Sequence, residues 1–391
     1  MRDAVILEGA RTPFCRAGTG FARVSARELG RVAVREAIER SEVAPRDIDE
    51  VIVGNTAGCR ETSNIARVIA LSAGVPRRVP AFTVNRSCGS ALQAIAEGAL
   101  RIRSGESDVV VAAGTESSTQ AISGVLETGL VDPVSGLNMG RAAEILAREF
   151  GVTRAEQDGL ALVSHQRAAR ARAEGRFGEE IVPVPLPPGF ERLVDRDDGP
   201  REDQSLEALA KLPPRYEKEY GTVTAGNSCG TADGAAAVVL STREKARAMG
   251  AKPIGRVRAV AFAACEPERT GLAPIYASAL ALRRAGATLG DVGLVEMHES
   301  FASQVLACLR AMASADFARD NLGQAAPLGA LDLDRTNVNG GAIAIGHPSG
   351  ASGARLVLTL LREMRRRNVP LGLATMCIDG GQGGAIVVEL A

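Results

Sequence analysis

The chain has 391 residues, 46% hydrophobic and 24% charged, which is ordinary for a globular protein with room for two or three domains. Lys+Arg and Asp+Glu both number 46, so the formal charge of zero provides no overall field for nucleic acid or an acidic membrane. Trp is absent and aromatic residues make up 3%, which disfavours base stacking. No apolar run approaches the ~20 residues of a membrane-spanning helix.

Residues 1–8 predict a β-strand that begins at once, without the apolar segment that opens a signal peptide. The seven cysteines are odd in number and widely spaced, and they form no C-x-x-C pair, so neither a disulfide framework nor a zinc cluster is expected. They are Cys15, Cys59, Cys88, Cys229, Cys265, Cys308 and Cys377. We therefore predict a reduced, cytoplasmic protein.

Cys88 stands at a predicted strand-to-helix junction, in the segment Val-Asn-Arg-Ser-Cys-Gly-Ser-Ala-Leu. Residues 81–84 are β-prone, and apolar residues recur at helical spacing after Cys88. A cysteine at the first turn of a helix feels the positive end of the helix dipole and free backbone N–H groups, which both favour the nucleophilic thiolate. A buried structural thiol is the competing interpretation, because cysteine is among the most buried residue types.

Two segments of the chain resemble each other at an offset of 244, with residue 37 lying over residue 281. Each combines a helix end, a short connection that contains Asp47 or Asp291, and a buried strand. The units that follow also correspond, since Cys88 and His347 each precede a predicted helix and then a strand. This alternation predicts mixed α/β layers built from two similar halves.

The region between the halves, about residues 118–250, has a different character. It contains a charged, Ala-rich predicted helix at 154–174, followed by a Pro-rich, charged stretch at 182–215 that is typical of a loop. We interpret this region as an insertion that covers a site rather than as a third core.

The second half contains three clusters of small residues around reactive side chains. His347 lies between Gly346 and Pro348, Cys377 ends a predicted strand and enters a glycine turn, and His298 directly follows another strand. Strand ends are where ligand sites form in α/β proteins.

Structural roles are the competing interpretation for His298 and Cys377, and His165, the remaining histidine, is expected to be structural or on the surface. Considered together with Cys88, however, the Cys/His/Cys set suits acyl transfer with one nucleophile and two proton carriers. No Cys or His pair has the spacing of metal ligands, so we expect no metal site.

Five ordered motifs make the whole chain resemble the thiolases. They are Arg11-Thr-Pro-Phe, Asn85-Arg-Ser-Cys-Gly-Ser, Gly221-Thr-Val-Thr-Ala-Gly-Asn, Gly340-Gly-Ala-Ile-Ala-Ile-Gly-His-Pro and the glycine turn after Cys377. The resemblance implies an α/β thiolase fold, a five-layer αβαβα arrangement of two duplicated halves with an inserted loop domain. It divides the chain into an N-terminal half at 1–117 with a returning segment near 221–250, a loop domain over the CoA site at 118–220, and a C-terminal half at 251–391.

The same resemblance implies that Cys88 is the nucleophile that becomes the acyl-thioester, that His347 activates it, and that Cys377 protonates the departing acetyl-CoA enolate. This assignment is chemically sound, because a carbon–carbon bond next to a thioester breaks only if the enolate is stabilised and protonated. Two oxyanion holes are implied. One uses His347 and a water held by His298, and the other uses the backbone N–H groups of Cys88 and Asp379.

CoA is implied as a substrate, with no resident cofactor. The matching positions are Arg201, near the nucleotide, and Ser278, near the pantetheine. A solvated loop charge is the competing interpretation of Arg201. A homodimer or homotetramer is also implied.

Three departures from most thiolases resemble the thiolase subunit of the β-oxidation trifunctional complex. His298 stands where asparagine is usual, extra residues occur at about 312–323, and Asp379 replaces a glycine. They suggest a hydratase–dehydrogenase subunit as a partner. The Asp379 carboxylate would oppose an oxyanion unless it points away, so its backbone N–H is the expected working group.

We therefore predict thiolytic cleavage of 3-ketoacyl-CoA by CoA to acetyl-CoA and a shortened acyl-CoA. The alternative is a short-chain acetyl-CoA acetyltransferase that makes acetoacetyl-CoA. A ketosynthase is disfavoured because that class carries histidine at the position of Cys377. An inactive CoA-binding protein is disfavoured because Cys88, His347 and Cys377 are all present.

Overall fold

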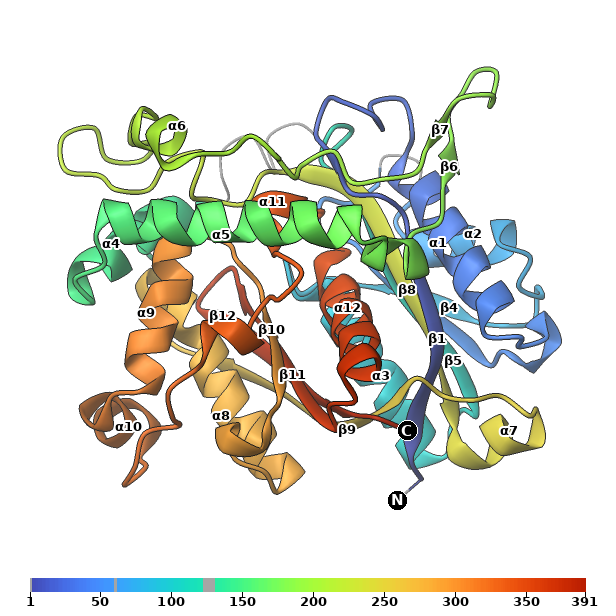
Figure 1. Ribbon diagram of the computed structural model, residues 1–391. Coiled ribbons are helices and arrows are strands. Elements are labelled where there is room, and N and C mark those ends of the chain that lie inside the picture. Colours follow the sequence, from blue (N-terminus) through green and yellow to red (C-terminus); the bar gives the residue numbers. More distant parts are fainter. Residues whose placement is uncertain (1, 60–61, 122–130) are drawn as a thin grey trace.

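The computed structural model describes residues 2–59, 62–121 and 131–391. Its centre is a ten-stranded mixed sheet in the order β10-β11-β12-β9-β1-β8-β5-β3-β4, with β2 paired to β8 (Figure 1). The strands are β1 Ala4–Arg11, β2 Cys15–Arg16, β3 Glu50–Gly54, β4 Ala81–Val84, β5 Val109–Ser117, β8 Ala232–Thr242, β9 Gly255–Ala264, β10 Leu294–Met297, β11 Leu371–Ile378 and β12 Gln382–Glu389.

The pairing directions of the strands are symmetric about the middle of the sheet, where β1 and β9 pair antiparallel. On one side β8, β5 and β3 follow β1, and on the other side β12, β11 and β10 follow β9. In both arms the first two pairings after the middle strand are antiparallel and the next is parallel. The short 3-10 helices Pro45–Asp47 and Leu289–Asp291 stand at the offset of 244, which confirms the predicted duplication.

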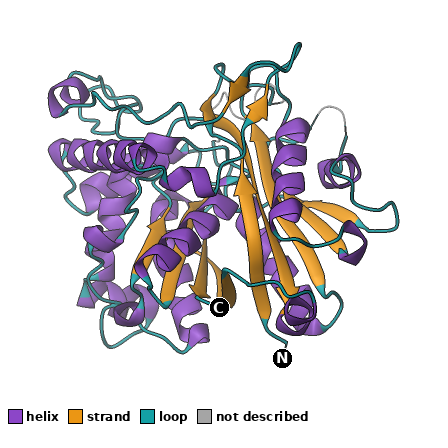
Figure 2. Cartoon of the chain, turned by 45° about the vertical axis from the view of Figure 1, so that its right-hand side comes forward, coloured by secondary structure: helices purple, strands orange, loops and turns teal. Residues whose placement is uncertain are grey.

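Helices cover the outer faces of the two arms and fill the space between them, which gives the five layers of the predicted fold (Figure 2). The outer layer of the N-terminal arm contains α1 Ala26–Arg40, α2 Ile65–Ser72 and α7 Arg243–Ala248. The outer layer of the C-terminal arm contains α8 Ala273–Ala285, α9 Ala302–Met312 and α10 Ala315–Leu322. The middle layer consists of α3 Ser90–Ser104 and α12 Ser352–Arg367.

Side chains along β5 alternate between the two faces of the sheet, so this strand packs in two hydrophobic clusters. Val110 and Ala112 pack in the cluster that contains α3 and α12, whereas Val109, Val111 and Ala113 pack in the cluster that contains α1. All five side chains are buried, as expected for a strand with helices on both faces.

The segment between the halves runs over one end of the layers. Helix α5, Arg154–Ala173, begins at a capping box formed by Thr153 and Glu156 and crosses the top of the molecule in Figure 1. The remaining elements are α4 Met139–Glu149, α6 Leu206–Ala210, α11 Ala342–Ile345, and a two-stranded ribbon of β6 Val184–Pro185 and β7 Leu193–Val194. The prediction of a loop at 182–215 is therefore incomplete, because this segment contains the ribbon and α6. Among the described residues, no helix is long and apolar enough to cross a membrane.

Close approaches between glycines and backbone bring the beginnings of the two middle helices together. A Cβ on Gly114 would lie 2.0 Å from the Gly350 carbonyl oxygen, and one on Gly353 would lie 2.5 Å from the Leu92 nitrogen. Only glycine fits at such contacts. The turns before α3 and α12 consequently meet at the same edge of the layers, under α5.

Candidate active site

Cys88 sits in a tight turn between β4 and α3. Ser87 has a φ of 45°, a left-handed backbone that is strained for a residue with a side chain. Its carbonyl is held in place by the Ser90 hydroxyl at 2.6 Å and the Thr56 hydroxyl at 2.9 Å. Gly89 follows because a Cβ there would lie 2.3 Å from Ile378. These contacts aim the thiol across the seam between the halves.

Burial raises the pKa of the Cys88 thiol, so its resting state is the neutral thiol. A hydrogen bond with the Ser349 hydroxyl lowers the pKa, the charge of Asp379 raises it, and backbone N–H groups of Asp379 and of Cys88 lower it. The thiolate expected from the helix start is therefore wrong for the resting site, because the loss of hydration outweighs the favourable dipoles. A base must take the proton when the sulfur attacks.

His347 is suited to be that base. Its Nδ1 lies 2.7 Å from the Ser352 hydroxyl, and its backbone N–H donates to the Gly230 carbonyl at 2.9 Å. Its Nε2 has no hydrogen-bond partner among the described residues. Burial, and then the charge of Arg355, lower the pKa of His347 to about 4, so the imidazole is neutral and can accept a proton.

His298 lies beside His347, with ring centroids 4.2 Å apart at an interplanar angle of 54°. Its backbone N–H donates to the Thr375 carbonyl at 2.9 Å, but neither ring nitrogen has a partner within the described part of the chain. The side chain is fully buried, and burial holds its pKa well below the usual value. A buried imidazole nitrogen without a hydrogen bond lowers the stability of the fold, so these nitrogens are suited to bind a water or a substrate oxygen.

Cys377 ends β11 with its sulfur 3.1 Å from the Ser300 hydroxyl. Burial raises the pKa of Cys377 to about 12, so it holds its proton at neutral pH. The charges of Cys88 and Asp379 also raise this pKa, which means that the three groups share one site. A proton-bearing thiol beside a second thiol and a neutral imidazole has the properties of a general acid.

The turn after Cys377 carries Asp379 and two glycines in the left-handed region, Gly380 at φ 79° and Gly381 at φ 76°. Thr270 ties its ends together, since its hydroxyl donates to the Ile378 carbonyl at 2.9 Å and accepts from the Gly381 N–H at 3.1 Å. The Asp379 N–H is directed at the Cys88 sulfur. The Asp379 side chain accepts from the Gly380 N–H, and burial and the nearby Asp132 raise its pKa.

A cavity of about 160 Å³ is lined in part by Gly230 and Gly346, whose neighbours in space and sequence include His347. Its lining also includes Arg201 and His165. His165, expected to be structural or at the surface, is buried and accepts a hydrogen bond from the Arg201 backbone N–H at 3.2 Å. It is thus part of the cavity wall.

A second, open cavity of about 1140 Å³ also includes Arg201, together with Arg192 and Arg196. Ser278 lines neither cavity. It is fully buried on the face of α8 that packs against the sheet, and its hydroxyl lies 3.1 Å from that of Thr375. The structure does not bring Ser278 to a surface where CoA would reach it.

Several contacts of the site join residues that sequence spacing did not connect. Ser349, Ser352 and Ser300 lie inside the motif clusters, so their presence near the site could have been inferred from the sequence. Cys229 comes two residues after the end of the Gly221 motif, and burial and the charges of Cys88 and Cys377 raise its pKa. Glu116 had no signal in the sequence, because it lies in the part of β5 beyond the strand predicted at 108–113. Within the described residues no group of three or more His, Cys, Asp or Glu side chains forms a metal-binding cluster.

Comparison with known proteins identifies both halves. The thiolase N-terminal domain profile matches residues 4–244 and the thiolase C-terminal domain profile matches residues 251–390. A 3-ketoacyl-CoA thiolase of Yersinia enterocolitica is 40% identical over 420 aligned positions, which cover 98% of this chain and 96% of the relative. A 3-ketoacyl-CoA thiolase of Yersinia pestis is 39% identical, covering 99% of this chain and 96% of the relative.

Solved structures agree over the whole length. The acetyl-CoA acetyltransferase of Bacillus anthracis superposes with a TM-score of 0.92 at 34% identity, covering 100% of this chain and 99% of the other. Human mitochondrial 3-ketoacyl-CoA thiolase in complex with CoA superposes with a TM-score of 0.90 at 35% identity, covering 100% and 98%. From its two domain matches, its relatives and its architecture, this chain belongs to the thiolase family.

Proposed function

We propose that this protein cleaves 3-ketoacyl-CoA thioesters with CoA, releasing acetyl-CoA and an acyl-CoA shortened by two carbons. The observation that carries the proposal is the pairing of a neutral nucleophilic thiol, Cys88, with a neutral imidazole and a second, proton-bearing thiol at one seam. The 3-ketoacyl-CoA thiolases among its relatives support the same reaction.

In the first half-reaction the Cys88 sulfur attacks the 3-keto carbon while His347 Nε2 takes the thiol proton. The bond between carbons 2 and 3 then breaks, its electron pair leaves on the acetyl-CoA enolate, and Cys377 donates a proton to carbon 2. Acetyl-CoA departs and the acyl chain remains as a thioester on Cys88. A positioned acid or base of this kind contributes about 10²- to 10⁴-fold to the rate.

In the second half-reaction free CoA attacks the thioester. Its thiol proton passes to the Cys377 thiolate, and Cys88 leaves and recovers its proton from His347. Acyl-CoA is released and all three residues return to their starting protonation states. Because every step is reversible, the same site can join two acetyl groups into acetoacetyl-CoA.

Negative charge develops on oxygen in both steps, and the site offers donors in two places. The unpartnered nitrogens of His298 and His347 suit a water or the enolate oxygen. The backbone N–H groups of Cys88 and Asp379 lie beside the Cys88 sulfur, so they can donate to the oxygen of a thioester formed on it. One such donor is worth about 10²- to 10³-fold in kcat.

CoA enters this scheme as a substrate and not as a resident cofactor. We propose that its pantetheine arm follows the cavity beside Gly230 and Gly346 and that its phosphates lie near Arg201, under the loop domain of residues 118–220. The open cavity has Arg192 and Arg196 on its wall, but acidic side chains such as Asp195 and Asp198 line it as well, so its charge is mixed and Arg201 remains the cation of this proposal. The Ser278 contact is not part of this proposal.

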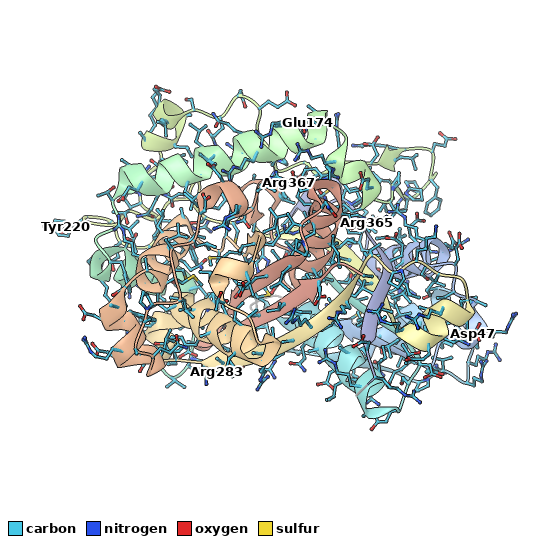
Figure 3. All side chains as sticks on the ribbon, turned by 60° about the horizontal axis from the view of Figure 1, so that its bottom comes forward. Asp47, Glu174, Tyr220, Arg283, Arg365 and Arg367 are labelled. Carbon is cyan, nitrogen blue, oxygen red and sulfur yellow. The ribbon has the colours of Figure 1, made fainter. Side chains whose placement is uncertain are left out.

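Replacing Arg201 by alanine tests the CoA site. We expect the KM for CoA to rise about tenfold, a loss of about 1.4 kcal/mol, with kcat unchanged, because a phosphate contact is made equally in the ground state and the transition state. Arg283→Ala is the matched control, since Arg283 lies on α8 at the outer edge of the molecule in Figure 3. Equal KM values for the two variants would contradict the placement.

The reaction itself is tested by supplying purified protein with CoA and 3-ketoacyl-CoAs of increasing length while following the loss of substrate absorbance. Cleavage across several lengths is the expected result. Cleavage of acetoacetyl-CoA alone would favour the short-chain acetyl-CoA acetyltransferase, a name carried by the Bacillus anthracis structure. Absence of cleavage at every length would leave only a CoA-binding protein.

A homodimer or homotetramer is part of the proposal. Strand β4 lies at one end of the sheet order, with its four residues half-exposed, and such an edge can pair with the same edge of a second copy. Light scattering on the eluting protein would determine the mass. His298 and α10, which occupies the extra residues, motivate a hydratase–dehydrogenase partner, and the seven free thiols fit the cytoplasm.

A further inference from the structure

Glu116 is a buried carboxylate beside the nucleophile that the mechanism does not use. It lies at the end of β5 and is 1% exposed. Its partners are uncharged donors rather than a cation: the Asn55 side-chain amide and the backbone N–H groups of Thr56, Ala57 and Gly350. Burial raises the pKa of Glu116 to about 7, so keeping an ionised group here costs stability. Such a cost suggests a role.

The donors come from loops in both halves of the molecule. Thr56 and Ala57 follow β3 in the N-terminal half, and Gly350 lies between His347 and α12 in the C-terminal half. One carboxylate oxygen, Oε2, accepts from Thr56 and from Gly350, at 3.0 Å each. The two loops are therefore clamped to each other through a single oxygen atom.

Each clamped loop also contacts the turn that carries Cys88. From the first loop, the Thr56 hydroxyl donates to the carbonyl of Ser87, the strained residue that precedes Cys88, at 2.9 Å. From the second, the Ser349 hydroxyl donates to the Thr56 hydroxyl at 3.3 Å and is close enough to the Cys88 thiol to lower its pKa. Glu116 is therefore connected through both loops to the turn that contains Cys88.

We propose that Glu116 is a positioning residue for Cys88, which it orients by fixing the Thr56 and Ser349 loops against each other. This inference rests on the proposed function of Cys88 as nucleophile. Glu116 does not touch the reacting atoms. Its carboxylate matters because it offers acceptors on both oxygens, whereas an amide would present an NH2 group to N–H donors at one of them.

The test is Glu116→Gln, which keeps the shape and removes the second acceptor. We expect kcat and the single-turnover rate of Cys88 acylation to fall on the order of 100-fold, the effect of misplacing a reacting group by about 1 Å. The KM for CoA should stay unchanged, because the CoA cavity does not include this network. A merely structural carboxylate would not separate kcat from KM in this way.

Glu180→Gln is the matched control. Glu180 is also 1% exposed and bonded, to Arg11 and to Thr359, but it has no link to Cys88 among these contacts. Wild-type and Glu180→Gln protein should both turn over. If wild-type protein is inactive, the proposed function has failed; if wild-type protein is active and both variants lose equally, the inference about Glu116 has failed.

Thr56→Val provides an independent route should Glu116→Gln fail to fold. It preserves the volume of the side chain and removes only the hydroxyl that reaches Ser87 and Ser349. A lowered acylation rate with an unchanged KM for CoA is again expected. A wild-type acylation rate in a folded Thr56→Val protein would overturn the proposal.

Discussion

Replacing Cys88 by alanine is expected to abolish both turnover and the covalent acyl-enzyme. No other described thiol combines this turn with a base and two directed backbone N–H groups, so nothing replaces the lost sulfur. The measurement is the intact mass of the protein after incubation with acetoacetyl-CoA in the absence of free CoA. Wild-type protein should gain one acetyl group and Cys88→Ala none.

Cys308→Ala serves as the control for that experiment. Cys308 is fully buried in α9, and its thiol donates a hydrogen bond to the Gly271 carbonyl at 3.1 Å. This variant should lose some stability, as cavity-forming substitutions do, yet still become acylated. If Cys88→Ala were acylated as fully as Cys308→Ala, another group would have to be the nucleophile.

Replacing Cys377 by alanine is expected to separate the two halves of the chemistry. Acylation of Cys88 by a simple acyl-CoA requires no carbon–carbon bond cleavage, so it should proceed at close to the wild-type rate. Thiolytic cleavage should fall by about 10²- to 10⁴-fold, because the enolate lacks its proton donor. The two rates are measured side by side, by intact mass and by loss of 3-ketoacyl-CoA absorbance.

A second signature of Cys377 is exchange of the hydrogens on carbon 2 of acetyl-CoA with deuterated solvent. That exchange needs proton removal and return at carbon 2, and it should disappear in Cys377→Ala. Retention of both exchange and cleavage would reassign the acid to another residue. Loss of acylation as well would mean that Cys377 supports the site as a whole.

Much of the architecture could be predicted from the sequence because duplication leaves a regular signal. The offset of 244 predicts a short connection at Asp291 followed by a buried strand, and the structure has the 3-10 helix Leu289–Asp291 and the strand β10 there. Glycine-rich motifs likewise marked the turns around His347 and Cys377, since close packing allows few other residues there. These features are local, and local features can be read along a chain.

The state of the Cys88 thiol could not be read in this way. The helix start is visible in the sequence, but the burial that raises the pKa of the thiol depends on segments far along the chain that pack around it, and the charge of Asp379 that also raises the pKa comes from there too. Ser278 shows the same limit, because nothing in its local sequence tells that its helix face packs against the sheet. Glu116 acquires its partners only when two halves fold together.

The duplication of the two halves also bears on how many acyl groups one chain can hold. Helices α3 and α12 begin at Ser90 and Ser352, so the counterpart of Cys88 in the second repeat is Gly350. A Cβ at Gly350 would lie 2.6 Å from the Thr115 carbonyl oxygen, so no side chain fits there. The second repeat therefore has no side chain at the position that corresponds to Cys88. We expect labelling with a single acyl group per polypeptide.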